Sequence, residues 1–148
     1  MFAGLLLAFC ATLFSFTPKF GGEGFQVYVN NKMVLERYGS QMDNIQTLTL
    51  DEYSTNGQIT VKYFHCGKIG KGRVITIKDD HQNVLKQWKF SDVTEAVPAM
   101  NCSVKEIIGL GKNINSNTLN LYYASSELPA GRLLAAIQIS NATAKKAP

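Results

Sequence analysis

Residues 58–90 read QITVKYFHCGKIGKGRVITIKDDHQNVLKQWKF, and this stretch decides the fold that we expect. Apolar and polar residues alternate over 59–64 and again over 74–78, which is the two-residue period of a β-strand with one buried face. A third run, 84–90, carries the only tryptophan, Trp88, on its apolar side. We predict three antiparallel strands in the middle of a small β-sandwich, with Trp88 largely buried.

The rest of the chain predicts five more strands, each marked by the same alternation. They are expected at 25–29, 33–38, 45–50, 119–123 and 133–139. Asn30 and Asn31 tolerate positive φ and predict a tight hairpin, and 127–131 predicts a second tight connection. Eight short strands separated by turns favour an all-β, antiparallel β-sandwich over a barrel.

One short helix is expected after the irregular segment 91–101. Ser103 and Glu106 have the spacing of a capping box, and apolar residues follow at helical spacing. Gly109 or Gly111 is expected to end this helix, because glycine commonly follows the last helical turn.

The chain divides into a leader at 1–22, one β-sandwich domain at 23–140 and a flexible tail at 141–148. Residues 1–16 form a continuous apolar run, which is typical of a signal peptide and short for a membrane span. No basic residue precedes this run and no clean cleavage site follows it, so a retained membrane anchor and lipidation at Cys10 stay as alternatives. We expect an exported protein, periplasmic or on the cell surface, that meets the membrane only through an uncleaved leader.

The net charge of +4 arises from the central stretch. Residues 62–89 hold seven basic side chains against Asp79 and Asp80. This is the composition of a patch for an anionic partner, but these lysines alternate with core residues instead of clustering. We therefore interpret them as solvated strand faces and expect no nucleic-acid partner.

Cys66 and Cys102 are the only cysteines after the leader. An exported protein pairs such residues in a disulfide, and the alternative is two buried free thiols. Zinc would need closely spaced ligand pairs, which His65, His81 and the two cysteines do not supply, so we expect no metal and no cofactor. With no catalytic motif, we expect no enzymatic activity; a small hydrolase or redox protein would need His81 close to Cys66.

Aromatic side chains are the remaining candidates for ligand binding. The six tyrosines and Trp88 would suit a sugar-binding face, although such residues are more often half-buried parts of strands. The residues that we select as candidates are Tyr63, Trp88, Tyr122, Lys68, Lys71 and Arg73. We expect a binding or accessory module of the cell envelope, with an envelope protein or a glycan as partner; the alternative is a sugar- or lipid-binding protein with exposed aromatics.

Two segments carry a resemblance to known proteins. Residues 63–90, YFHCGKIGKGRVITIKDDHQNVLKQWKF, and 118–139, TLNLYYASSELPAGRLLAAIQI, resemble the small exported β-sandwich proteins of unknown function from Bacteroidetes. The resemblance implies a periplasmic or surface setting and assigns no catalytic residue.

Overall fold

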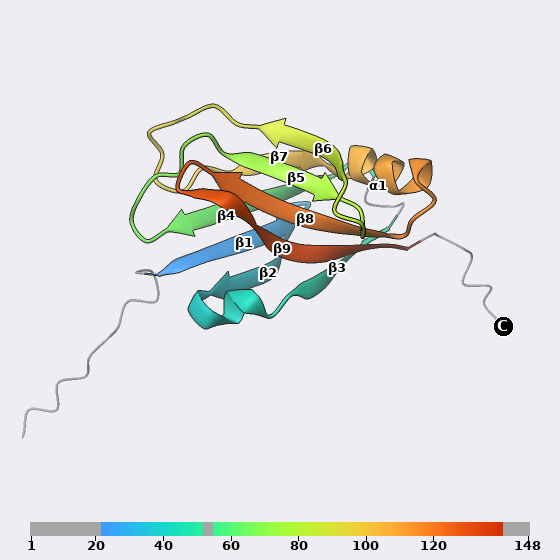
Figure 1. The fold of residues 1–148 in the computed structure, drawn as a ribbon, viewed down its shortest axis with the longest axis horizontal. Coiled ribbons are helices and arrows are strands. Elements are labelled where there is room, and N and C mark those ends of the chain that lie inside the picture. The colour runs from blue at the N-terminus through green and yellow to red at the C-terminus, as the bar shows by residue number, and fades with distance from the viewer. Residues whose placement is uncertain (1–21, 52–54, 141–148) are drawn as a thin grey trace, which may run out of the picture.

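Two β-sheets packed face to face form the body of the protein (Figure 1). The computed structural model describes residues 22–51 and 55–140. The described chain is mostly strand, with one α-helix and one 3₁₀ helix, so the predicted β-sandwich is confirmed. The predicted leader up to residue 21 and the predicted tail at 141–148 lie outside the described residues.

Nine strands and two helical segments follow one another along the described chain. They are β1 (Glu23–Val29), β2 (Lys32–Tyr38), η1 (Gly39–Asp43), β3 (Gln46–Asp51), β4 (Gln58–His65), β5 (Val74–Lys78), β6 (Val84–Lys89), β7 (Met100–Ser103), α1 (Val104–Asn113), β8 (Thr118–Ser125) and β9 (Leu128–Ser140). The four-stranded sheet has the order β2-β1-β4-β7, and the five-stranded sheet has the order β3-β9-β8-β5-β6.

The central stretch does not form three neighbouring strands as predicted. The glycine-rich loop 66–73 crosses from one sheet to the other, so β4 pairs with β1 and β7, whereas β5 pairs with β6 and β8. All strand pairs are antiparallel except β3 with β9, whose parallel register runs from Gln46 opposite Ala135 to Asp51 opposite Ser140. The wholly antiparallel arrangement that we predicted is therefore wrong at this one pair.

Alternating residues of the inner strands fill the space between the sheets. Ile59, Val61 and Tyr63 from β4 are buried, as the two-residue period predicted. The ring of Tyr63 stacks on that of Tyr123 from β8, with 4.2 Å between the ring centroids. This pair joins the two sheets across the core near the end of β4.

The edge strand β6 departs from its predicted burial. Trp88 is only partly buried against the core, and Val84, which shares its predicted apolar side, is 54% exposed. A register shift between Ile77 and Lys78 interrupts the pairing of β5 with β6 at the Val84 end of β6. The ammonium of Lys86 lies 5.8 Å from the centroid of the Trp88 ring and covers part of it.

Two predicted local motifs are confirmed, one with a different end point. Asn30 and Asn31 adopt φ values of 51° and 65° in the hairpin between β1 and β2. The hydroxyl of Ser103 accepts a hydrogen bond from the Glu106 backbone N–H and caps α1. The helix does not end at Gly109 or Gly111 as predicted but continues to Asn113. A side chain at Gly111 would lie 2.4 Å from Ile139 Cδ1, so this glycine serves close packing instead of termination.

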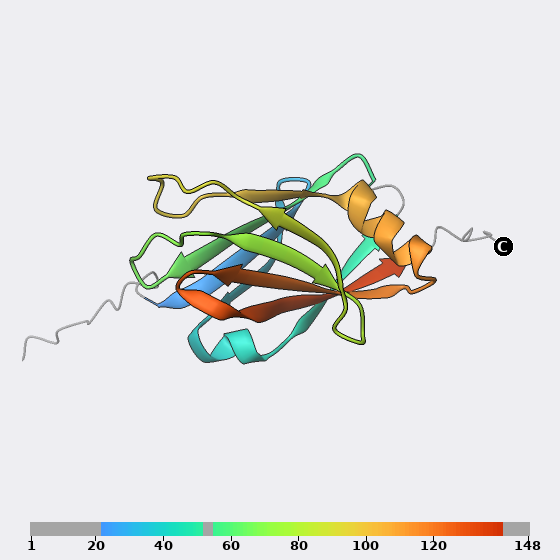
Figure 2. The ribbon, with the colours of Figure 1, turned by 45° about the horizontal axis from the view of Figure 1, so that its top comes forward.

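Two connections also differ from their prediction. Residues 91–101 were expected to be irregular throughout, but β7 begins at Met100 and adds a ninth strand. The tight connection expected at 127–131 is narrower, because only residues 126 and 127 turn and β9 begins at Leu128. Figure 2 shows α1, which follows β7, lying across one end of the sandwich.

Candidate functional site

The structure scatters the six predicted ligand-binding residues over the molecule. Tyr63 and Arg73 are each 4% exposed and lie in the interior. Trp88 lies at the edge of the five-stranded sheet, and Tyr122 lies on its outer face. Lys68 and Lys71 are exposed in the loop between β4 and β5. These residues do not form one site.

The basic residues are scattered in the same way. Lys62 lies on the outer face of the four-stranded sheet, and Lys78 lies over the Tyr122 ring on the other sheet. Lys86 pairs with Glu106 of α1 at 3.5 Å, and Arg73 is buried with its Nη2 donating to the carbonyl oxygen of Ser91. A single basic patch is therefore not formed by these four residues.

The histidine and cysteine residues that were considered for catalysis or metal binding also do not gather in one site. Cys66 follows β4 at one end of the sandwich, whereas His81 lies in the hairpin between β5 and β6 at the other end (Figure 1). Within residues 22–51 and 55–140, no three His, Cys, Asp or Glu side chains are grouped so as to hold a metal ion. The close approach of His81 and Cys66 on which we based the hydrolase or redox alternative is not seen in this part of the chain.

Cys66 and Cys102 are free thiols, and they lie far apart. Cys102 pairs with Ile59 near the start of β4, whereas Cys66 lies seven positions beyond Ile59 in the sequence, just past the end of that strand. At the rise of a β-strand this separation is about 23 Å, whereas a disulfide needs Cα atoms within about 7 Å. An intramolecular bridge between them does not fit this fold.

A polar cluster lies inside the sandwich near the end of β4. His65 Nε2 is 2.8 Å from the hydroxyl of Tyr123 and 3.4 Å from Ser125 Oγ. The Tyr63 hydroxyl donates to Glu23, which pairs with Arg132 at 3.7 Å. Burial and then Glu23 raise the pKa of Tyr63, so its phenol stays protonated. Ser125 is 5% exposed, and its Oγ accepts a bond from the Leu128 N–H, so the cluster has the character of a structural network.

This cluster makes stability depend on pH through His65. Burial lowers the pKa of His65 from its ordinary 6.5, against the opposite effect of Glu127 and Glu23. The unfolded chain then binds more protons than the folded protein just below pH 6.5, so stability falls as the pH drops through that window.

We expect the thermal midpoint to fall less between pH 7 and 5 in His65→Asn than in the wild type. His81→Asn, on the exposed hairpin, serves as the control, and its thermal midpoint is expected to fall as much as that of the wild type. An equal fall of the thermal midpoint in all three proteins would contradict the prediction.

The outer face of the four-stranded sheet carries a group of half-buried and exposed side chains that contact one another. We call it the tyrosine face and define it by Tyr28, Tyr38, Phe64, Gln26, Glu36, Lys62, Thr60 and Asn101. The strand register arranges them in rows across the sheet. Tyr38 and Phe64 flank Gly24, Glu36 and Lys62 flank Gln26, and Tyr28 is followed by Thr60 and Asn101.

A glycine shapes the first row. The rings of Tyr38 and Phe64 approach each other with 5.6 Å between their centroids. A Cβ at Gly24 would lie 2.0 Å from Tyr38 Cδ1, so the ring occupies the space that a side chain would fill. Glycine therefore allows two aromatic rings to meet over the middle strand.

Hydrogen bonds fix the side chains of the other rows. The Tyr28 hydroxyl donates to Gln26 Oε1 at 2.9 Å, and Gln26 Nε2 donates to Glu36 Oε1 at 2.8 Å. Thr60 Oγ1 donates to Asn101 Oδ1 at 2.7 Å, which joins β4 to β7. Side chains held in this way lose little further conformational freedom when a ligand binds.

A hollow of about 340 Å³ lies beside Tyr28 on this face. Its lining is mostly amide and hydroxyl side chains around one aromatic ring, namely Tyr28, Asn31, Gln58, Thr60, Lys62, Ala99 and Asn101. This volume is within the range of small-molecule sites, about 300–1,000 Å³. The lining offers hydrogen-bond donors and acceptors beside an aromatic surface.

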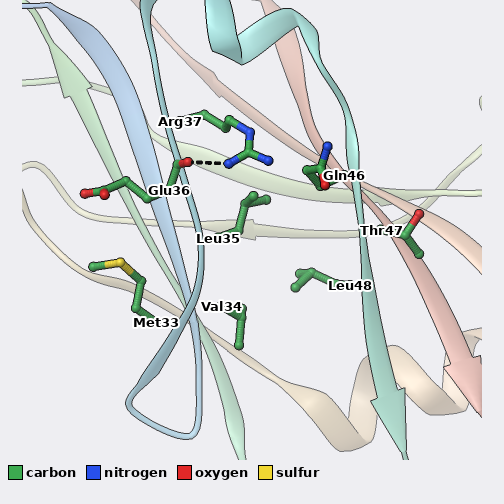
Figure 3. Close-up of a pocket in the computed structure, with 8 residues that line it drawn as sticks. All are labelled: Met33, Val34, Leu35, Glu36, Arg37, Gln46, Thr47 and Leu48. Carbon is green, nitrogen blue, oxygen red and sulfur yellow. Dashed lines mark hydrogen bonds between the residues drawn. The ribbon is translucent and has the colours of Figure 1, made fainter.

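A second groove, of about 430 Å³, separates the edge strands β2 and β3 (Figure 3). Leu35 points from β2 toward β3, whereas Met33 and Glu36 point away from the groove (Figure 3). The register shift in the β1–β2 pair and the charges of β2 are features that discourage strand addition at an edge. Leu35 and Leu48 below the groove are each 6% exposed, so it presents little apolar surface.

No family model matches this chain. A search of curated proteins finds no match either. The resemblance to exported Bacteroidetes proteins therefore stays a prediction. Among the described residues, no helix is long and apolar enough to cross a membrane.

Sequence reasoning selected part of the tyrosine face and missed the rest. Tyr28 and Tyr38 belonged to the aromatic residues considered for binding, whereas Phe64, Gln26 and Asn101 were not considered as ligand-binding residues. The sequence did contain a signal for these residues, because in each strand they alternate with the buried ones. Gln26 and Tyr28 on β1 share the outer face with Phe64 on β4 for this reason. The strand order that places these residues side by side is not readable from that alternation.

Proposed function

We propose that this protein is a non-enzymatic, exported binding module of the cell envelope that binds a glycan on its tyrosine face. The observation that carries the proposal is the hollow beside Tyr28, in which an aromatic ring and several amide and hydroxyl groups converge. Aromatic rings offer an apolar surface with a polar tip, which suits the mixed character of a sugar. Polar groups around such a ring fix the orientation of a ligand.

Rigidity supports this proposal. Tyr28, Thr60 and Lys62 of the hollow stand on β1 and β4. These two strands pair over the whole length from Glu23 with His65 to Val29 with Ile59. Sites built on paired strands hold their side chains in place better than sites on loops. The apolar leader predicted from the sequence supports the location, periplasmic or on the cell surface.

A lipid ligand is less well supported. A hollow that Phe64, Ile69 and Val97 line, among other residues, has a volume of about 220 Å³. This volume is below the range of about 300–1,000 Å³ that is usual for sites of small molecules. The tyrosine face, which is open and polar, suits a chain of sugars.

Affinity electrophoresis in gels that contain soluble polysaccharides tests the proposal. We expect at least one neutral or acidic polysaccharide to retard the protein, and Tyr28→Ala to weaken that binding about tenfold, which corresponds to about 1.4 kcal/mol. Tyr122→Ala is the matched control, because Tyr122 is also a half-buried tyrosine with a lysine over its ring, 4.3 Å away, but lies on the other sheet.

Thermal unfolding establishes that both variants stay folded before binding is compared. No retardation by any polysaccharide in a broad panel would refute the proposal. Equal binding by the wild type and Tyr28→Ala, or an equal loss in Tyr122→Ala, would place the site elsewhere and refute it as well.

A further inference from the structure

The hollow beside Tyr28 contains one charged side chain, that of Lys62. Its ammonium lies 5.6 Å from the centroid of the Tyr28 ring. In the part of the chain that the structure describes, Lys62 forms no ion pair with a carboxylate. The ring and the positive charge therefore face the same hollow.

The acidic residue of this face is on the opposite side of the middle strand. Gln26 pairs with Glu36 on β2 and with Lys62 on β4, so two strand spacings, about 10 Å, separate the backbones of the two charged residues. The Glu36 carboxylate accepts hydrogen bonds from Gln26 and from the Tyr38 hydroxyl. Glu36 is thus engaged away from the hollow, and the hollow keeps a positive character.

We propose that the tyrosine face selects an acidic glycan, a polysaccharide whose sugars carry carboxylate groups. The inference rests on the proposed glycan binding and names the class of ligand. A sugar ring packs on Tyr28, its hydroxyl groups bind amides such as that of Asn101, and its carboxylate pairs with Lys62. A charge-assisted hydrogen bond of this kind is stronger than a neutral one, so it decides between acidic and neutral sugars.

Polymers that differ only in charge test this inference. Polygalacturonate, alginate and hyaluronate are each compared with their own methyl ester, which keeps the sugar backbone and removes the charge. We expect at least one acid form to bind and its ester to bind about tenfold more weakly. We also expect Lys62→Gln to weaken binding of the acid form about tenfold and to leave binding of the ester unchanged.

Lys78→Gln is the matched control for net charge. Lys78 lies over the Tyr122 ring on the other sheet, so the variant loses the same charge and leaves the hollow intact. An equal loss of binding in Lys78→Gln and Lys62→Gln would show attraction by net charge alone and would overturn the inference.

Two further results separate this inference from the proposed function. Binding of neutral polysaccharides that depends on Tyr28, with acid and ester forms bound equally, overturns the acidic ligand and leaves glycan binding standing. Failure of every polymer, acidic or neutral, overturns both.

Discussion

Replacing Tyr123 with alanine is expected to lower the free energy of unfolding by about 4 kcal/mol, within the range for aromatic truncation in a core. Tyr123 is fully buried, and its ring stacks on Tyr63 across the two sheets. The change removes this stacking and opens a cavity between the sheets. It also leaves His65 without the partner that lies 2.8 Å from its Nε2. Urea denaturation followed by tryptophan fluorescence measures the loss.

Two matched variants divide this effect into its parts. Tyr123→Phe keeps the ring and removes the hydroxyl, and it is expected to cost about 1 kcal/mol. Tyr122→Ala removes the neighbouring tyrosine, which lies on the outer face, and is expected to cost clearly less than Tyr123→Ala. A loss below about 1 kcal/mol in Tyr123→Ala would show that the sheets do not depend on this contact.

Cys66 and Cys102 are expected to react with an alkylating reagent at very different rates. Cys66 is exposed in the turn after β4, whereas Cys102 is 1% exposed on β7. Burial, and then the charge of Glu106, raise the pKa of the Cys102 thiol to about 12, which removes the reactive thiolate. In native protein without reductant we expect full labelling of Cys66 and none of Cys102 within minutes, with both labelled in denaturant.

Peptide mapping by mass spectrometry assigns each label, so that Cys10 is counted separately. Cys66→Ser is the control and is expected to remove the fast reaction while leaving the slow one. Protein in which both cysteines resist alkylation in denaturant, until reductant is added, would contain the disulfide and would contradict the fold described here.

The alternation of residues predicted the interior well, because a sheet with one buried face imposes a two-residue period. Ile59, Val61 and Tyr63 are in the core for that reason. The period contains no information on strand order, so the sequence did not show that β4 and β5 belong to different sheets. The four-residue strand β7 was missed because it is too short to display a period.

The candidate site was harder to predict for a related reason. Tyr63 fitted the apolar row of β4, and that argument alone removes it from a ligand-binding face. The next residue, Phe64, has the opposite phase and points to the outer face. Its ring meets that of Tyr38 because β2 and β4 both pair with β1, and the glycine between the two residues, Gly24, has no side chain to keep the rings apart. Pairings between distant segments create the tyrosine face, whereas the sequence displays only the phase of each strand.

The parallel pair of β3 and β9 has a consequence for the order of assembly. β3 is made early, but its only partner in the sheet is the last strand of the described chain. Contacts between segments so distant in sequence form late and slow the folding of β-proteins. A nascent chain therefore leaves β3 unpaired until synthesis has passed Ser140. If the protein is exported as we propose, this delay favours a chain that is still unfolded, which is the form that can be threaded through a narrow translocation channel.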